Sequence, residues 1–394
     1  MKNNQYVITG IMFVITIVVI SSSTFVINRQ EIIDAIKDVN IFKTIEKVYT
    51  SDVAFSQVFI NIWSSLQFNN LFSKIKLYDD VEYGVIMQDA DGSLYFPDAK
   101  VDVTKYADIV KSFSDEVTKN GSKYVYIQAP DKILKDYSDS RLFEYNFSNE
   151  NADNFLQGLK EKDVEYLDLR EEIVKDKLDR SNMFYKSDHH WNTKTAFWAY
   201  QKIINLLKTN YSFDIDREGF YTNLENYNQV TKEKCFIGSL GRRVGEAVTE
   251  LDDYTFIEPR FETKYALYNG VVSLIEPIKQ GNFQNTIKIN SILNNKDNKT
   301  NRHSAYFEWD YGFLRVCNEL IDNDYKILFI KDSYSLPLVA YLSTCISQID
   351  MVDLRDTPKA DVKKMIKDNN YDIVIQIYNT EVFNDTMFSY WHFS

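Results

Sequence analysis

Three residues of this chain have the side-chain types that nucleophilic catalysis needs, and two of them lie in one short segment. Residues 186–192 read KSDHHWN and place Asp188 beside two of the four histidines in the chain. An aspartate that accepts a hydrogen bond from one ring nitrogen of a histidine fixes its tautomer and leaves the other nitrogen free to act as a base. His190 follows Asp188 by two residues, so a single turn can join them. We take Asp188 and His190 as the candidate acid–base pair.

The third residue is Ser333, which lies far downstream in a polar turn. It follows an apolar run at residues 326–330 and precedes a helical pattern, so we expect it at the carboxyl end of a sheet strand, where ligands approach. A serine hydroxyl needs a base to take its proton, and the amides of such a junction can stabilise an oxyanion. The G-x-S-x-G elbow is absent. We predict that Asp188, His190 and Ser333 meet in space.

Simpler interpretations of the same residues stay open. Ser333 can be only a helix cap, and the two adjacent histidines can be an exposed polar turn. Asp188, His189 and His190 can also hold a metal ion, although no further His/Asp cluster at ligand spacing occurs in the chain. We expect no cofactor and no metal.

Helical and strand patterns alternate from residue 103 onwards, which is typical of a mostly parallel sheet with helices on both faces. The expected strands are 124–128, 164–168, 326–330, 350–354 and 371–378, and the expected helices are 104–120, 154–162, 193–208, 336–347 and 360–368. Residues 211–322 break the rhythm and predict a β-containing insertion over the sheet edge, with short strands at 254–257 and 286–289. Before the alternation, residues 83–96 predict a hairpin that turns at Asp91-Gly92.

The N-terminal part predicts attachment to a membrane. Residues 6–27 carry no charge and are rich in Ile, Val, Phe and Thr, a length suited to crossing a hydrocarbon core of about 30 Å. We predict a transmembrane anchor here, with a cleaved signal peptide as the alternative. Helical spacing over 28–82 predicts a stalk, and 83–394 the main domain, which we place outside the cytoplasm.

Composition limits the classes of partner. The 394 residues are 44% hydrophobic and carry a formal net charge of -12, which supplies a large core but no basic face for nucleic acid. The three cysteines, Cys235, Cys317 and Cys345, are widely spaced and odd in number, so we expect inert buried thiols and no disulfide framework.

Further residues are candidates for contacts with a substrate or an oxyanion. A loop at 238–243 holds two cations, and one arginine directly follows an expected strand; a tight connection and a surface ion pair are the simpler interpretations. Exposed aromatic rings can stack on sugars, although most rings of this chain must be core. The candidates for substrate or oxyanion contacts are Gly238, Ser239, Arg242, Tyr334 and Arg355, and those for stacking are Trp191, Tyr306, Trp309, Tyr311 and Tyr334.

Four motifs in this order resemble those of a known family. They are SDHHWN at 187–192, FIGSLGRR at 236–243, IKDSY at 330–334 and MVDLR at 351–355. The chain resembles, from about residue 50 to 379, the DHHW proteins of Gram-positive bacteria, which are relatives of the alginate O-acetylation proteins within the circularly permuted SGNH-hydrolase superfamily. The resemblance implies Asp188 and His190 as the acid–base pair and Ser333 as the nucleophile, with Lys331 where many SGNH enzymes have glycine.

The resemblance also implies an activity. It is that of a membrane-anchored, extracytoplasmic serine O-acetyltransferase or acetylesterase acting on an extracellular or cell-wall polysaccharide, with a membrane acyl-transfer partner of the MBOAT family. The alternatives are a non-catalytic polysaccharide-binding or assembly subunit of an export and modification complex, and a metal-dependent hydrolase.

Overall fold

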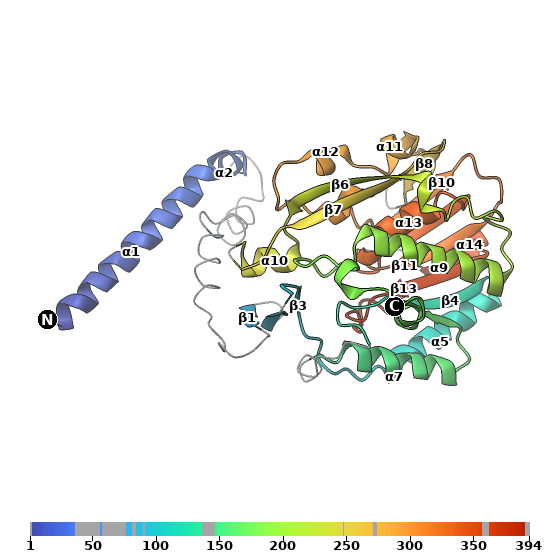
Figure 1. The fold of residues 1–394 in the computed structure, drawn as a ribbon, viewed down its shortest axis with the longest axis horizontal. Helices are drawn as coiled ribbons and strands as arrows, with labels where there is room; N and C mark the ends of the chain where they lie inside the picture. Colours follow the sequence, from blue (N-terminus) through green and yellow to red (C-terminus); the bar gives the residue numbers. More distant parts are fainter. Residues whose placement is uncertain are drawn as a thin grey trace. The chain divides into compact units, whose positions relative to one another are not determined.

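The structure is a computed structural model, and it describes part of the chain (Figure 1). The described residues are 2–35, 56, 76–80, 84–89, 91–135, 146–246, 248–270, 274–356 and 362–390. The chain divides into two compact units. One unit comprises residues 1–69 with 243–248, and the other comprises 70–242 with 249–394. The domain limits predicted after residues 27 and 82 stay predictions.

The larger unit is built around one mixed eight-stranded sheet. Its order is β5 (Tyr166–Asp168), β4 (Lys123–Gln128), β13 (Ile373–Tyr378), β11 (Lys326–Lys331), β12 (Gln348–Val352), β10 (Phe313–Asn318), β8 (Tyr265–Asn269) and β9 (Lys279–Gly281). The first five strands pair in parallel, and the last three extend the sheet in antiparallel fashion. The predicted α/β architecture with a mostly parallel sheet is confirmed for the first five strands.

Helices cover both faces of this sheet (Figure 1). One apolar cluster holds residues of α9 (Thr193–Tyr211) and α13 (Leu336–Leu342), and the other holds residues of α5 (Thr104–Lys119), α7 (Ser148–Glu161) and α14 (Val362–Asn369). Strand β11 contributes side chains to both clusters, because successive side chains of a strand point to opposite faces of the sheet. Ile327 and Phe329 belong to the first cluster, and Leu328 and Ile330 to the second. Each such side chain contributes about 1.5–3 kcal/mol through burial.

The strand register places several chain segments at one edge of the sheet. Ile330 lies opposite Val352, where β11 and β12 run in parallel, and Val352 lies opposite Phe313 on β10. Because β10 runs antiparallel to β12, the start of β10 lies at the edge where β11 and β12 end. The residues that follow β11 and β12 and those that precede β10 therefore share this carboxyl edge.

The insertion differs from the prediction in two ways. Strands β6 (Tyr227–Phe236) and β7 (Asp252–Pro259) form a separate antiparallel ribbon, but β8, β9 and β10 join the main sheet, so the insertion extends the sheet as well as covering it. The strand expected at 286–289 is wrong. Thr286, the first residue of that stretch, is the last residue of the helix α11 (Phe283–Thr286). The side chain of Asn282 caps this helix by accepting a hydrogen bond from Asn285 N. The strand-type pairing recorded in this stretch is an isolated bridge between Lys288 and Tyr306.

A small antiparallel sheet precedes the alternating region. It consists of β1 (Lys76–Asp80), β2 (Gly84–Gln88) and β3 (Leu94–Tyr95). The predicted hairpin is confirmed, with Gly92 at φ 85° in its turn, a conformation that glycine adopts without a steric cost. Strand β1 corrects the helical stalk prediction at residues 76–80, because these residues pair with β2.

The N-terminal residues form two helices, α1 (Lys2–Ile27) and α2 (Arg29–Ala35). Residues 36–75 of the predicted stalk, apart from residue 56, lie outside the described residues, and so do the side chains of residues 1–13. The searched part of the structure holds no helix with the length and apolar character needed to traverse a lipid bilayer. It therefore gives no support to the anchor predicted at 6–27.

Short helical elements connect these parts. They are α8 (Leu169–Asp176), α10 (Ser239–Val244), α12 (Asn290–Asn294) and the 3₁₀ turns η1 (Arg180–Asn182), η2 (Leu224–Asn226), η3 (Arg302–Ala305) and η4 (Ser333–Ser335).

The start of α9 is fixed by a cap that a single substitution removes. The side chain of Asn192 caps the helix by accepting a hydrogen bond from Thr195 N at 2.9 Å. We expect Asn192→Ala to lower the free energy of unfolding by about 1 kcal/mol, because one helix amide loses its acceptor. Urea denaturation followed by circular dichroism measures the change. Asn192→Asp keeps the oxygen and is the matched control; an equal loss in both variants contradicts the assignment.

Candidate active site

Ser333 lies in a tight turn directly after β11. Asp332 fixes this turn, because its carboxylate accepts hydrogen bonds from Tyr334 N at 3.0 Å and from Asn379 N at 2.7 Å. Asp332, and not Ser333, is therefore the cap of η4. The hydroxyl of Ser333 lies instead 2.8 Å from His190 Nε2.

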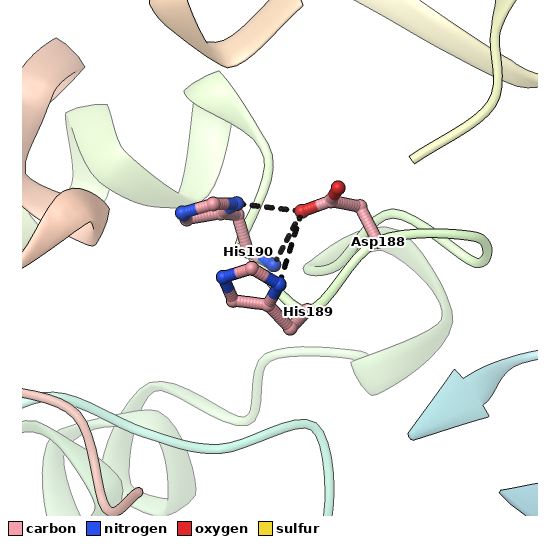
Figure 2. Close-up of side chains that lie close together, drawn as sticks. All are labelled: Asp188, His189 and His190. Carbon is pink, nitrogen blue, oxygen red and sulfur yellow. Dashed lines mark hydrogen bonds and ion pairs between the residues drawn. The ribbon is translucent and has the colours of Figure 1, made fainter. Parts of the chain in front are cut away.

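Asp188 completes a continuous chain of polar contacts. Its Oδ1 lies 2.5 Å from His190 Nδ1 and also accepts a hydrogen bond from His190 N at 3.0 Å (Figure 2). His190 thus has one ring nitrogen on the carboxylate and the other on the Ser333 hydroxyl. The structure brings together the three side chains that the sequence singled out, at positions 188, 190 and 333.

The loop at 238–239 holds Asp188 in place. Ser239 N donates to Asp188 Oδ2 at 2.7 Å, and Gly238 N donates to Ser187 Oγ at 2.7 Å. A Cβ on Gly238 would lie 2.2 Å from Asp188 Cβ, so only glycine fits this approach. These two amides, considered from sequence as contacts for substrate or oxyanion, bind groups of the protein itself. Arg242 likewise donates to the carbonyl of Ile237 at 3.1 Å.

His189 points to a different partner from His190. Its Nδ1 lies 2.8 Å from Ser239 Oγ and 3.8 Å from Asp188 Oδ1. Asp188, His189 and His190 offer ligand atoms within 4.8 Å of one another, which is the predicted alternative of a metal site. However, tetrahedral zinc ligands at ordinary bond lengths lie about 3.4 Å apart. The 2.5 Å contact between Asp188 and His190 fits a hydrogen bond better than a pair of metal ligands.

His303 is a site residue that the sequence reasoning missed. It lies on η3 of the insertion, and its Nε2 lies 2.6 Å from the carbonyl oxygen of Ser333. Its ring stacks on that of His190, with centroids 3.9 Å apart and planes at 14°. It therefore contacts both the turn that carries the hydroxyl and the imidazole beside it. The only sequence signal was its type, since no motif surrounds it.

Burial and close neighbours set the charges of this site. Burial lowers the pKa of His190 well below its ordinary value, and His189 and His303 lower it further, against the opposing effect of Asp188. Burial alone would raise the pKa of Asp188, but the adjacent histidines and the donated hydrogen bonds lower it well below its usual value. The resting site thus holds a neutral imidazole beside an ionised carboxylate.

The remaining predicted residues surround the turn. Tyr334 is buried, and its hydroxyl donates to the carbonyl of His189. Arg355 donates to Asp353 at 2.6 Å and 2.9 Å, and its side chain is 42% exposed. Lys331 is fully buried between Asp310 and Asp353, at 2.5 Å and 3.1 Å, which gives its ammonium two carboxylate partners at the position where the resemblance implied glycine.

Two hollows of about 540 Å³ lie elsewhere on the larger unit. One is lined by residues at the amino edge of the sheet, including Lys123, Tyr325 and Asp372. The other is lined by residues that include both ends of the 186–192 loop, Lys186 and Asn192, and Asp252 of β7. Neither hollow is lined by His190 or Ser333, so the chemistry of the site, and not the size of a cavity, identifies it.

Comparison with known proteins supports the resemblance stated from the motifs. Residues 90–235 match the family described as SGNH hydrolase-like domain, acetyltransferase AlgX. This stretch of the chain is similar to an SGNH hydrolase-like domain. The matched stretch includes Asp188 and His190 and ends before Ser333. The description of the family as an acetyltransferase supports acyl transfer as the general chemistry of this domain.

Solved structures share this SGNH-like fold over most of the chain. Bacillus cereus PatB1 with a sulfonyl adduct has a TM-score of 0.64 and 19% identity, covering 80% of this chain and 99% of that one. A DHHW family protein from Eubacterium siraeum has a TM-score of 0.61 and 17% identity, covering 81% and 99%. At such identities the likeness concerns the fold. The search of curated proteins found no match.

The buried charge network before Ser333 is open to a stability test. We expect Lys331→Met to lower the free energy of unfolding by about 3 kcal/mol, because it leaves buried carboxylates without their ammonium partner. Urea denaturation measures the loss. The double variant Lys331→Met/Asp310→Asn removes one of the two carboxylates that the single variant leaves unpaired. It should therefore recover part of the lost free energy of unfolding. A loss below about 1 kcal/mol in the single variant contradicts this account of the network.

Proposed function

We propose that this protein is an extracytoplasmic serine O-acetyltransferase or acetylesterase that acts on an extracellular or cell-wall polysaccharide. The observation that carries the proposal is the unbroken chain of contacts from Asp188 Oδ1 through both ring nitrogens of His190 to Ser333 Oγ. The match to an acetyltransferase family supports acetyl as the transferred group. The 2.8 Å separation of serine and imidazole supports catalysis over a purely structural subunit.

Each side chain has one role in this proposal. His190 Nε2 takes the proton of Ser333 as the serine oxygen attacks the carbonyl carbon of an acetyl ester. The carbon–oxygen bond to the leaving alcohol then breaks, and His190 returns the proton to that alcohol. A sugar hydroxyl or a water attacks the acetyl-serine in the same way and regenerates the enzyme. Asp188 keeps the Nδ1 proton in place and stabilises the imidazolium that forms in each step.

The partners follow from the same proposal. The acceptor is a polysaccharide, and the acetyl group reaches the site from a membrane acyl-transfer protein of the MBOAT family. The anchor predicted at residues 6–27 is not part of the proposal, because no helix in the searched part of the chain supports it.

The nucleophile can be identified by covalent labelling. We expect phenylmethylsulfonyl fluoride to modify Ser333, because the activated oxygen attacks sulfur and expels fluoride; the relative PatB1 was solved with a sulfonyl adduct. Intact and peptide mass spectrometry locate the adduct. Ser333→Ala should abolish labelling and lower kcat/KM for a chromogenic acetyl ester by about a thousandfold or more.

A matched serine provides the control for this experiment. Ser335 lies two residues further along the same 3₁₀ turn and is fully buried. Ser335→Ala should keep both the labelling and most of the esterase activity. Full activity in the Ser333→Ala variant refutes the proposed nucleophile, and labelling at a different serine redirects the proposal to that residue.

The pH profile tests the proposed base. A general base works in its neutral form, so activity falls when acid protonates it. Because burial lowers the pKa of His190 well below 6.5, the acid limb moves to lower pH. We expect kcat/KM for the chromogenic ester to stay constant from pH 6.5 to about pH 8 and to decline only below 6.5. A midpoint at or above 6.5 argues against His190 as the base.

A further inference from the structure

Trp309 lies at the same edge of the sheet as Ser333. It precedes β10 by four residues, and β10 begins at Phe313, which is opposite Val352 at the end of β12. Val352 is in turn opposite Ile330, three residues before Ser333. Neighbouring strands lie about 4.8 Å apart, so the strands that carry Trp309 and Ser333, with β12 between them, are about 10 Å apart.

Side-chain contacts tie the segment around Trp309 to the Ser333 turn at two points. Six residues before it, His303 bonds the Ser333 carbonyl. One residue after it, Asp310 pairs with Lys331, two residues before Ser333. Residues on both sides of Trp309 therefore tie its segment to the edge of the sheet that carries the proposed nucleophile.

Trp309 differs from the other aromatic residues considered as sugar-stacking candidates. Trp191, Tyr306 and Tyr334 are fully buried in the core and Tyr311 is partly buried against it, whereas Trp309 is 64% exposed. The two residues before it, Phe307 and Glu308, have φ of 65° and 79°, a conformation that side chains of this size rarely adopt. Strained backbone of this kind is common at ligand-binding sites, where the surrounding structure enforces it. Here it presents a large apolar ring to solvent.

The ion pairs around Trp309 balance in charge. Lys331 and Arg355 supply two positive charges, and Asp310 and Asp353 supply two negative charges, all within one network. Glu308, the residue before Trp309, pairs with Lys279 at 3.3 Å. Arg355 and Asp310 are partly exposed, with side chains 42% and 29% accessible, so they can exchange hydrogen bonds with hydroxyl groups. A balanced rim suits a neutral ligand, and the formal net charge of -12 disfavours a polyanion.

We propose that Trp309, with Asp310 and Arg355 at its side, is a binding platform for a neutral hexopyranose unit of the acceptor polysaccharide. The indole face takes the C–H face of a ring whose hydroxyl groups are equatorial, as in glucose and N-acetylglucosamine, while the carboxylate and guanidinium bind hydroxyls at the ring edge. The inference rests on the proposed function for the identity of the acceptor, and it adds the sugar class and the place where the sugar binds.

Direct binding tests the platform without using catalysis. Isothermal titration of the full chain with cellotetraose and with chitotetraose should show binding of at least one, and Trp309→Ala should weaken that binding at least tenfold. Trp309→Phe keeps an aromatic face and should retain binding to within about threefold. The matched control is Phe220→Ala, which removes an exposed aromatic ring beside Phe261, away from this edge, and should bind as the wild type does. An oligomannuronate of equal length should bind more weakly than the neutral sugars.

The outcomes separate this inference from the proposed function. Unchanged affinity in Trp309→Ala, or no binding of either neutral tetrasaccharide by the wild type, overturns the platform. Stronger binding of the oligomannuronate overturns the neutral specificity. If Ser333 resists sulfonylation while tetrasaccharide binding depends on Trp309, then the enzymatic proposal fails and the platform stands. Circular dichroism of each variant confirms that the fold is kept.

Discussion

The hydrogen bond between Asp188 and His190 is the contact on which the arrangement of the site depends. It joins two residues that are neighbours in sequence, yet it is buried, so neither group can exchange its partner for water. Burial lowers the pKa of the imidazole and would raise that of the carboxyl. The carboxylate stays ionised because the adjacent histidines and the hydrogen bonds from His190 lower its pKa against this effect. It also accepts a hydrogen bond from Ser239 N. The neutral ring therefore has one orientation, with its free nitrogen on Ser333.

Charged side chains fix the turn that presents Ser333. A glycine-rich elbow would instead rely on the wider range of backbone angles that glycine can adopt. Asp332 accepts two backbone hydrogen bonds and so fixes the direction of the chain after β11. Lys331 is anchored by two carboxylates, and one of these, Asp353, follows the neighbouring strand β12. Separating the partners of a buried ion pair leaves a buried charge unpaired, which is costly, so this network resists distortion. The serine is thus held by elements on two strands of the sheet.

The insertion contributes to the site as well as to the fold. Through β8, β9 and β10 it continues the sheet beyond β12, and the segment before β10 returns to the carboxyl edge. His303 stacks on His190 and contacts the Ser333 carbonyl, and Asp310 pairs with Lys331. One continuous stretch of the insertion therefore supplies both a support for the proposed catalytic groups and the exposed indole of Trp309. These contacts join the proposed chemistry to the proposed acceptor site.

The sequence by itself determined the alternating strands and helices and the residue types at 188, 190 and 333. Those features depend on local patterns: hydrophobic periodicity, a turn after an apolar run, and an aspartate two residues before a histidine. The strand expected at 286–289 failed because a cap at Asn282 outweighed β-propensity, and the stalk expected through 76–80 failed because strand pairing with β2 outweighed helical spacing. Only the tertiary structure decided that β10 would return to the carboxyl edge, which places His303 against Ser333 and Trp309 at the same edge. Contacts between residues so far apart in the chain depend on strand register, which no short segment encodes.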